Sequence, residues 1–497
     1  MTKRKLSILL MLMLITMIFV ACGPDEAVGG DTINGNRDDS DDYSSVDDEI
    51  DEEAERLALI TPDLPNITFN GHHFRVLNTE NSAMPWMLTV LDEEELSGEM
   101  FSDAVYHRNR RVEQEFDIII SETRLPNMGM VRDRARQDIR AGNAEIDLFM
   151  LTNNDVFGLA QDGYLICYHS IPHIDLSRIY WDQDMQRDLS INNRLFTMNG
   201  DFTFTHYSAT MVMFFNKGLH QDFGLDCPYQ LVRDGRWTLN AFHEMARQAY
   251  ADLDGNGIFD HNDRFGYLGI THISVPALLA GAGEVYLAKD PSDDRPILNV
   301  GTQRFVNAYH AILDVLHDGN LFFNADHNHR LQDVMFPGDQ SLFWTELMNW
   351  ASILREMETD FGILPHPMLD ENQDVPRSAV SGTNFMAVPS TTIDLERTGV
   401  ILEALSAYSR QMVMPVYYDV MLSTVIARDD ESGEMLDIIF ANRVYDPAIQ
   451  FFGGLVFDPF NNLVRANNRD VSAFVDANGV RIETQIQNVM DRFWELD

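Results

Sequence analysis

Short apolar runs alternate with amphipathic stretches of helical spacing from about residue 74 onward, and this alternation constrains the fold more than any other feature. Phe74 to Leu77, Phe116 to Ile120 and Ile146 to Leu151 have the length of strands, and the last is continuously apolar, as in parallel sheets covered on both faces. Between the first two runs, apolar residues recur at helical spacing, at Phe101, Ala104, Val105, Val112 and Phe116. The β-α-β order predicts an α/β fold. Because 497 residues can bury more than one core, we expect at least two lobes.

A helix-rich region follows, from about Phe215 to Pro367. Two apolar stripes in it predict helices that face a core, at Phe242, Met245, Ala246 and Ala249 and at Phe305, Ala308, Tyr309, Ile312, Leu313 and Leu316. After this region, Asn384 to Val388 and Val420 to Ile426 return to strand-like composition. The sequence shows no internal repeat.

The N-terminus has the pattern of an export signal. Lys3, Arg4 and Lys5 precede an apolar run, Leu6 to Ala21, that is shorter than the roughly 20 residues a membrane-spanning helix needs. The run ends at Cys22 in a sequence that resembles a bacterial lipobox, whose cysteine is diacylated and becomes the new N-terminus. We therefore predict a signal peptide over residues 1–22 and a lipid anchor on the extracellular face of a bacterial membrane. The alternative is a secretory cleavage site that happens to contain a cysteine and yields a soluble product.

Acidic residues outnumber basic ones, 78 to 36, for a formal net charge of -42. Such a field repels phosphates, which excludes nucleic acid as a partner and disfavours anionic ligands. Residues 23–66 are rich in Gly, Asp and Ser and lack apolar periodicity, so we expect an acidic, disordered tether. Cys167 and Cys227 are the two cysteines beyond the signal, and their spacing does not show that they pair. We expect both to be buried and free.

One segment has the spacing of an EF-hand calcium loop. Counting from Asp252, a glycine stands sixth, an apolar residue eighth, and oxygen-bearing side chains at the other ligand positions. The predicted Ca²⁺ ligands are Asp252, Asp254, Asn256, the backbone carbonyl of Ile258, Asp260 and Asp263. The last replaces the usual bidentate Glu, and the segment from Phe265 to Ile270 is not helical in pattern, so an isolated structural loop is predicted. The alternative is a polar turn of Asp-Gly and Asn-Gly dipeptides without metal.

Catalytic signatures are incomplete in this sequence. His243-Glu244 begins like a zinc-protease helix, but Arg247 stands where the second histidine ligand must be. Gly281-Ala282-Gly283 lacks the third glycine of a dinucleotide fingerprint. Neither a Gly-x-Ser-x-Gly elbow nor a phosphate-binding loop occurs. Acidic residues are too numerous for a glycosidase pair to be picked out, and we expect a protein without enzymatic activity.

Several segments, in the order in which they occur, resemble the extracellular solute-binding proteins (family 1) of carbohydrate ABC transporters. They are Leu96 to Glu113, Trp181-Asp182-Gln183, Asn199-Gly200-Asp201, Phe215-Asn216-Lys217, Gly235 to Thr238 and Asp360 to Pro365. The resemblance implies a two-lobed, periplasmic-binding-protein-like (type II) fold with a ligand cleft and hinge closure. It also implies chain crossings near Thr210 to Asn216, Ser381 to Pro389 and Tyr417 to Val425. The implied lobes are residues 67–211 with 382–422, and 212–381 with 423–497.

Ligand-binding residues follow from the same resemblance. In maltose-binding members a loop after a strand of the first lobe holds sugar hydroxyls through an Asp, and Asn153 and Asp155 stand at that place after Leu151. Asp155 could instead cap the helix that we expect to begin at Val156. The resemblance also points to Asn78, Glu80, Trp86 and Trp344, and to Tyr207 and Tyr417 beside the crossings. Flat rings suit the CH faces of sugars, and carboxylates suit their hydroxyls. We assign Trp237, before a helix that Thr238 would cap, to packing.

The resemblance implies a function as a monomeric receptor that binds a sugar or oligosaccharide and presents it to the permease subunits of an ABC importer. An EF-like calcium loop also occurs in alginate-binding members, in agreement with the Asp252 segment. Two alternatives remain open at this point, a lipid-anchored carbohydrate-active enzyme and a ligand-sensing lipoprotein.

Overall fold

The computed structural model describes residues 57–80, 95–425 and 430–496. It divides into two units, one ending at Thr61 and a second, Pro62–Asp497, that carries the folded body. In the first unit the described residues, 57–61, include one helical turn. The predicted signal peptide with Cys22, most of the predicted tether and Trp86 lie outside the described residues. None of the helices within the described ranges is long and apolar enough to cross a membrane.

A four-stranded sheet, in the order β12-β3-β1-β2, organises what we call the first lobe. Its strands are β1 (His72–Thr79), β2 (Ile118–Leu125), β3 (Leu148–Leu151) and β12 (Phe385–Ala387). β1 pairs in parallel with β2, His72 opposite Ile118, and with β3, Val76 opposite Leu148, while β12 pairs antiparallel with β3. The predicted β-α-β order is therefore confirmed, with β2 starting two residues later than expected because Phe116 still belongs to the preceding helix.

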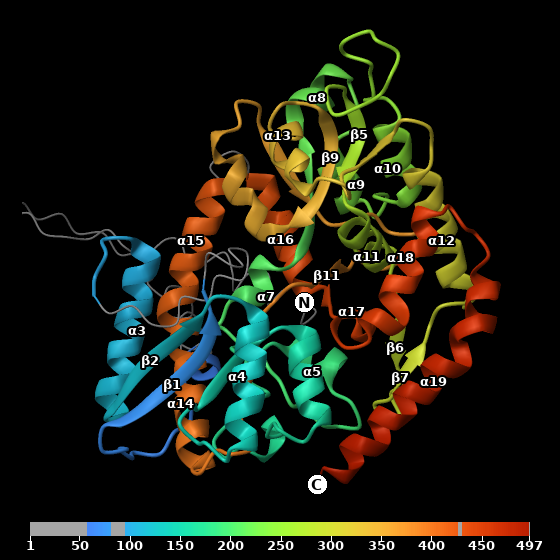
Figure 1. Cartoon of the computed structure of the whole chain (residues 1–497). Coiled ribbons are helices and arrows are strands. Elements are labelled where there is room, and N and C mark those ends of the chain that lie inside the picture. The colour runs from blue at the N-terminus through green and yellow to red at the C-terminus, as the bar shows by residue number, and fades with distance from the viewer. Residues whose placement is uncertain (1–56, 81–94, 426–429, 497) are drawn as a thin grey trace, which may run out of the picture. The chain divides into compact units, whose positions relative to one another are not determined.

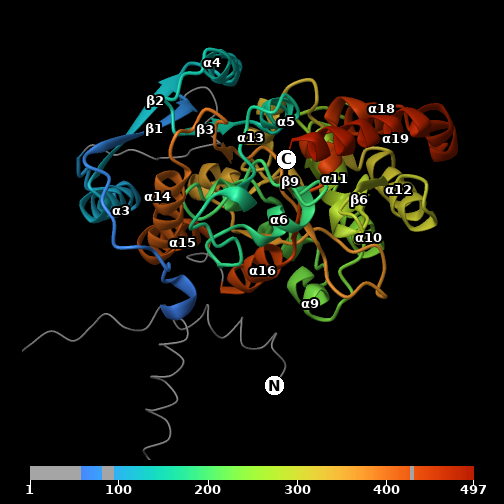
Figure 2. The same ribbon diagram turned by 90° about the horizontal axis from the view of Figure 1, so that it is seen from below.

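Helices cover both faces of this sheet, which explains why its central strands are apolar on both sides. α3 (Met100–Phe116) lies on one face and α4 (Met128–Arg140) on the other (Figures 1 and 2). α3 buries Val105, Val112 and Phe116, members of the predicted stripe. The remaining short helices before the second sheet are α5 (Asn153–Gln161), η3 (Tyr168–Ser170), α6 (Gln183–Leu189) and α7 (Thr205–Ser208).

A five-stranded sheet, in the order β10-β4-β9-β5-β8, organises the second lobe. Its strands are β4 (Met211–Asn216), β5 (Phe265–Gly269), β8 (Phe322–Asn324), β9 (Ser341–Leu347) and β10 (Phe361–Leu364). β5 is parallel to β8 and β9, whereas β4 is antiparallel to β9 and β10. The carboxyl ends of β5, β8 and β9 therefore lie at one edge of the sheet.

Between and beside these strands the chain forms helices and a hairpin, of which the hairpin lies away from the sheet, beside the C-terminal helix (Figure 1). They are α8 (Lys217–Asp222), α9 (Pro228–Arg233), α10 (Leu239–Ala246), α11 (Thr271–Gly281), β6 (Leu287–Lys289), β7 (Pro296–Leu298), α12 (Gln303–Leu316), η4 (His329–Leu331), α13 (Gln332–Met335) and η5 (Met348–Glu356). Trp237 is buried as predicted, with its Nε1 donating to the carbonyl of Pro365 at 2.9 Å. Thr238 caps α10 by accepting from Ala241 N at 3.3 Å, also as predicted. Cys167 is half-buried and free, whereas Cys227, at the start of α9, is free and exposed, so its predicted burial is wrong.

The segment predicted to be strand-like from Val420 to Ile426 is helical as far as Val425, and Ile426 lies outside the described residues. α14 (Leu395–Tyr408) continues through a π-helical turn, η6 (Ser409–Val413), into α15 (Met414–Val425) without a break. α14 and α15 both contact α3 of the first lobe, and α15 also contacts α16 (Asp430–Ala441), which packs on β10 of the second. Helical packing against both lobes has overridden the strand-like composition. One long helix therefore runs past both lobes.

The C-terminal part of the chain contacts both lobes. β11 (Ser378–Ala379) pairs in parallel with β13 (Arg443–Val444), and α17 (Pro447–Gln450), η7 (Gly453–Phe457) and α18 (Asp458–Arg465) follow. The final helix, α19 (Val471–Glu495), contacts β7 and α5. Its Phe493 ring lies 4.8 Å from that of Phe196 and 6.1 Å from that of Phe157. The residue boundaries given above for the two lobes remain a prediction.

Candidate functional site

The carboxyl end of β1 carries the first two predicted ligand-binding residues. Asn78 is buried, and its amide donates to Glu122 Oε1 on the neighbouring strand at 2.7 Å while its Oδ1 accepts from Thr79 N at 2.8 Å. Glu80 is exposed, and its backbone N–H continues the pairing with β2 by donating to Leu125 O at 2.8 Å. Asn78 therefore links two strands in this structure, and Glu80 is the one of the two that faces solvent.

The start of α5, after β3, carries the next pair. The helix begins at Asn153 with Thr152 as its N-cap, so Asp155 lies in the first turn, and the alternative that it caps a helix beginning at Val156 is wrong. Asp155 accepts from Thr152 Oγ1 at 2.8 Å and lies 3.4 Å from Arg132 on α4. The Asn153 amide donates to Ile449 O at 3.3 Å and to Gln450 Oε1 at 3.4 Å, both in α17. This strand end is tied to the returning C-terminal segment.

Tyr207 and Tyr417, predicted beside two crossings, lie together in one aromatic cluster. Their ring centroids are 6.5 Å apart. The cluster consists of Phe101, Phe204, Tyr207, Tyr417, Tyr418 and Phe440. Phe101 comes from α3 of the first lobe and Phe440 from α16, which packs on the second sheet. Tyr417 and Tyr418 are half-buried, so this cluster offers partly accessible rings where elements of both lobes meet.

A network of polar and charged groups, all buried except the half-buried Arg410, adjoins these rings, and we call it the crossing network. It consists of Asp182, Asp201, His206, Arg410, Arg443 and Tyr445. Arg410 Nε lies 2.6 Å from Asp201 Oδ2, and Arg443 Nη2 lies 3.3 Å from Asp182 Oδ1. The Tyr445 hydroxyl donates to Asp182 Oδ2 at 2.6 Å. The Arg443 guanidinium also lies 4.8 Å from the ring centroid of Tyr207, which joins the network to the aromatic cluster.

Burial sets the protonation of this network. It lowers the pKa of His206 to about 3, so the imidazole is neutral at physiological pH. For Asp182, burial is opposed by the nearby Arg443, and the net result is a lowered pKa. Arg443 Nη1 and His206 Nδ1 are buried and form no hydrogen bond among the described residues. Because an unpaired buried polar atom costs about 1–3 kcal/mol, these atoms are suited to pair with a hydroxyl or water.

Trp344 is a correction to the predicted site. The ring is fully buried, packs at 5.2 Å from Phe214 and 5.3 Å from Phe336, and donates from Nε1 to Gln332 at 3.1 Å. Trp344 lies in the middle of β9 instead of at its end, and its ring is packed within the protein core. Trp350 is half-buried beyond the carboxyl end of β9, and its ring lies 6.1 Å from that of Trp344.

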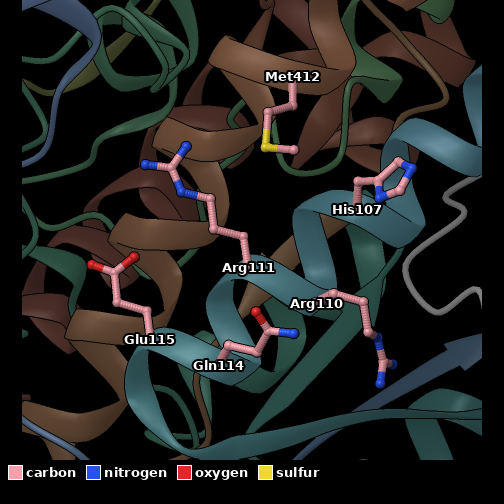
Figure 3. Close-up of a pocket in the computed structure, with 6 residues that line it drawn as sticks. All are labelled: His107, Arg110, Arg111, Gln114, Glu115 and Met412. Atoms are coloured by element: carbon pink, nitrogen blue, oxygen red, sulfur yellow. The ribbon is translucent and has the colours of Figure 1, made fainter.

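A hollow of about 570 Å³ lies on the surface of the first lobe, away from these residues. It is lined by His107, Arg110, Arg111, Gln114, Glu115 and Met412 (Figure 3). Figure 3 shows the first five side chains on α3 and Met412 opposite them on η6. Glu115 accepts a hydrogen bond from the Tyr408 hydroxyl at 2.7 Å, and the Arg111 guanidinium lies 3.7 Å from the centroid of the Tyr408 ring. None of the predicted ligand-binding residues lines this hollow.

Three of the predicted calcium ligands converge in the Asp252 loop. Ligand oxygens of Asp252, Asp254 and Asp263 all lie within 4.8 Å of one another. The backbone N–H groups of Asp260 and Leu253 hold the pKa of Asp263 below its usual value, so the carboxylate is ionised. A bridge between Ala251 and Arg264 closes the loop. All five predicted side-chain ligands accept hydrogen bonds from backbone N–H groups within the loop, and the Ile258 side chain is exposed.

Solved structures share this fold. A cyclic α-maltosyl-1,6-maltose binding protein from Arthrobacter globiformis matches with a TM-score of 0.56 and 16% identity, over 85% of this chain and 99% of its own. UgpB from Mycobacterium tuberculosis, in complex with glycerophosphocholine, matches with a TM-score of 0.51 and 16% identity, over 79% and 95%. An ABC substrate-binding protein from Listeria monocytogenes, in complex with cycloalternan, matches with a TM-score of 0.50 and 12% identity, over 85% and 98%.

No protein-family model and no curated protein sequence matches the chain. At these identities the structural matches establish the fold, and they confirm the predicted two-lobed α/β fold of the type II solute-binding proteins.

Proposed function

We propose that this protein is a solute-binding protein that captures a sugar or oligosaccharide and delivers it to an ABC importer. The fold supports this proposal, since the Arthrobacter globiformis protein is named for a cyclic oligosaccharide and the Listeria monocytogenes protein was solved with cycloalternan. Because UgpB was solved with glycerophosphocholine, the fold also accommodates other small polar solutes. The matched proteins are binding proteins, which favours a receptor over an enzyme.

The single observation that carries the proposal in this chain is the junction of the aromatic cluster with the crossing network. Half-buried tyrosine rings can stack on the CH faces of a sugar. Beside them, Arg443 Nη1 and His206 Nδ1 supply a donor and a second polar atom without partners among the described residues. Rings next to convergent polar groups are the usual composition of a small-molecule site. Asp155 and Glu80, at the strand ends of the first sheet, are the further residues proposed to contact the ligand.

The N-terminal pattern supports an extracellular location. With Cys22 diacylated, the acidic segment that follows would tether the receptor to the outer face of the cell membrane, close to the permease subunits. The Asp252 loop is proposed to bind Ca²⁺ as a structural ion, because three carboxylates with oxygens within 4.8 Å of one another offer the oxygen ligands that Ca²⁺ prefers. We propose that the receptor acts as a monomer.

The proposal is tested with the full chain in detergent. A panel of mono- and oligosaccharides is screened by thermal shift, and titration calorimetry gives the dissociation constant of any ligand that raises Tm. Tyr417→Ala is expected to weaken binding about tenfold or more, through loss of a stacking ring. Tyr250→Ala removes an exposed tyrosine near the Asp252 loop and serves as the matched control.

Two outcomes would contradict the proposal. A panel without any stabilising carbohydrate would remove sugar as the solute class. Release of cleaved products during incubation with oligosaccharides would favour the carbohydrate-active enzyme instead.

A further inference from the structure

Two histidines and an aspartate come together at the edge of the second sheet, outside the sites described so far. β5 and β8 are parallel neighbours with Gly269 opposite Asn324, so the residues that follow these two strands emerge side by side. His272 lies in the first turn of α11, after β5, while Asp326 follows β8 and His329 opens η4. Ligand atoms of these three side chains all lie within 4.8 Å of one another.

The two imidazoles have no competing partner. Among the described residues neither His272 nor His329 uses its ring in a hydrogen bond, and their ring centroids are 5.4 Å apart. His272 is half-buried, and His329 is exposed. Two imidazole rings at this separation, without hydrogen-bond partners, can each place a nitrogen on one metal ion.

Asp326 is held in position by its neighbours. Its Oδ2 accepts from Thr271 Oγ1 at 2.7 Å, from Arg465 Nε at 2.8 Å and from Asn324 Nδ2 at 3.3 Å. Its Oδ1 accepts one hydrogen bond, from Thr271 N at 2.8 Å, and so keeps a lone pair. Supporting contacts of this kind orient a carboxylate ligand, and Arg465 at the same time reduces the negative charge that the ion would experience.

We propose that His272, Asp326 and His329 bind one divalent transition-metal ion of the Zn²⁺ type. Two nitrogens and one carboxylate oxygen are a donor set that zinc accepts, with a fourth position left for water or an external ligand. Zinc–ligand distances near 2.0–2.2 Å bring ligand atoms to about 3.3 Å from one another. The exposed His329 on its short 3-10 turn is the ligand that moves inward to reach this spacing. Calcium, which prefers oxygen ligands, belongs instead to the Asp252 loop.

The proposal is tested by titrating Zn²⁺ into the full chain in detergent, with excess Ca²⁺ present so that the Asp252 loop does not compete. We expect one equivalent to bind. His272→Ala and His329→Ala are each expected to weaken binding by more than about 100-fold, since removal of supporting groups alone costs 10–100-fold. His327→Ala is the matched control, because this exposed histidine lies two residues from His329 and outside the cluster.

A spectroscopic readout separates this site from adventitious histidine binding. Co²⁺ in place of Zn²⁺ is expected to give visible absorption that disappears in His272→Ala and His329→Ala and persists in His327→Ala. Because His329 is exposed, its variant keeps the fold, and an unchanged Tm without metal verifies this. Equal stoichiometry and affinity in all variants, or an equal loss in His327→Ala, would overturn the proposal. Sugar binding does not enter either readout, so the result is independent of the proposed receptor function.

Discussion

The Asp252 loop and the crossing network both concentrate charge, but they are built in opposite ways. In the loop, the three converging carboxylates come from within twelve residues, and two of them, Asp252 and Asp254, reach solvent. In the network, Asp182 and Arg443 are 261 residues apart in sequence, and both are buried. Like charges converge in the loop, whereas opposite charges pair in the network. The charge of the loop would be neutralised by an external cation such as the proposed Ca²⁺, whereas the network contains its own cationic groups, Arg410 and Arg443.

This difference predicts different responses to substitution. Removing one partner of a buried ion pair leaves an uncompensated charge in the interior, whereas removing one carboxylate from a cluster of like charges relieves repulsion. Substitutions in the network should consequently lower the stability in every buffer. Substitutions in the loop should lower it only when calcium is present.

The largest effect is expected for Arg443→Met. The substitution leaves Asp182 buried opposite an apolar side chain, and we expect the free energy of unfolding to fall by about 3–5 kcal/mol, measured by urea denaturation. Arg233→Met is the control, because Arg233 pairs with Glu431 and Glu434 on the surface, where such pairs contribute about 0–1 kcal/mol. Equal losses in the two variants would remove the distinction between the two kinds of charged region.

A smaller effect is expected for calcium. At a concentration 100 times the dissociation constant, Ca²⁺ should stabilise the native chain by about 2.7 kcal/mol, seen as a rise in Tm that chelator reverses. In Asp254→Ala this rise should disappear, while the Tm in chelator should not fall, because repulsion among the three carboxylates is relieved. Asp476→Ala, an exposed position on α19, should respond to calcium as the native chain does. A native Tm that is the same with calcium and with chelator would show that the loop is a polar turn.

The smallest effect is expected for a buried carboxylate that belongs neither to an ion pair nor to a cluster of carboxylates among the described residues. Glu346 on β9 forms no ion pair among the described residues, and burial raises its pKa to about 8. The folded state therefore favours the protonated form. This stabilisation is complete below the ordinary pKa of 4.5 and is lost as the pH rises through about 8.

Glu346→Gln removes this pH dependence. The amide remains neutral, and its single oxygen can still accept from Leu347 N. Because one pKa unit corresponds to about 1.4 kcal/mol, we expect the variant to gain at least about 1 kcal/mol over the native chain between pH 6 and pH 8. Parallel stability curves for the two proteins over this range would contradict the assignment of Glu346 as a neutral buried acid.

The sequence was informative wherever the signal was local. Helical spacing located α3, the continuous apolar run located β3, and the order of strands and helices gave the α/β class. The Asp252 loop was predictable because its spacing alone brings three carboxylates together. The end of β3 was also identified, and Asn153 and Asp155 follow it as expected, while their contact with a ligand stays a prediction.

Contacts between distant segments could not be predicted, because no local sequence pattern indicates them. The pairing of Arg443 with Asp182 depends on the register of β11 with β13 and on the packing of segments far apart in sequence. The histidine pair at His272 and His329 depends likewise on β5 pairing with β8. Trp344 was misassigned because a tryptophan in the middle of a strand has the same local composition as one at its end. The helix over Val420 was missed because packing, and not propensity, decides it.

The unbroken run from α14 through η6 to α15 restricts how this molecule can deform. A continuous helix is stiff along its length, and this one contacts α3 on one side and α16 on the other. We expect it to permit torsion about its own axis and to oppose separation of the lobes along that axis. The widened π turn at Ser409–Val413 is where such torsion would be absorbed, because its looser turn holds the backbone less tightly than the α-helical segments on either side.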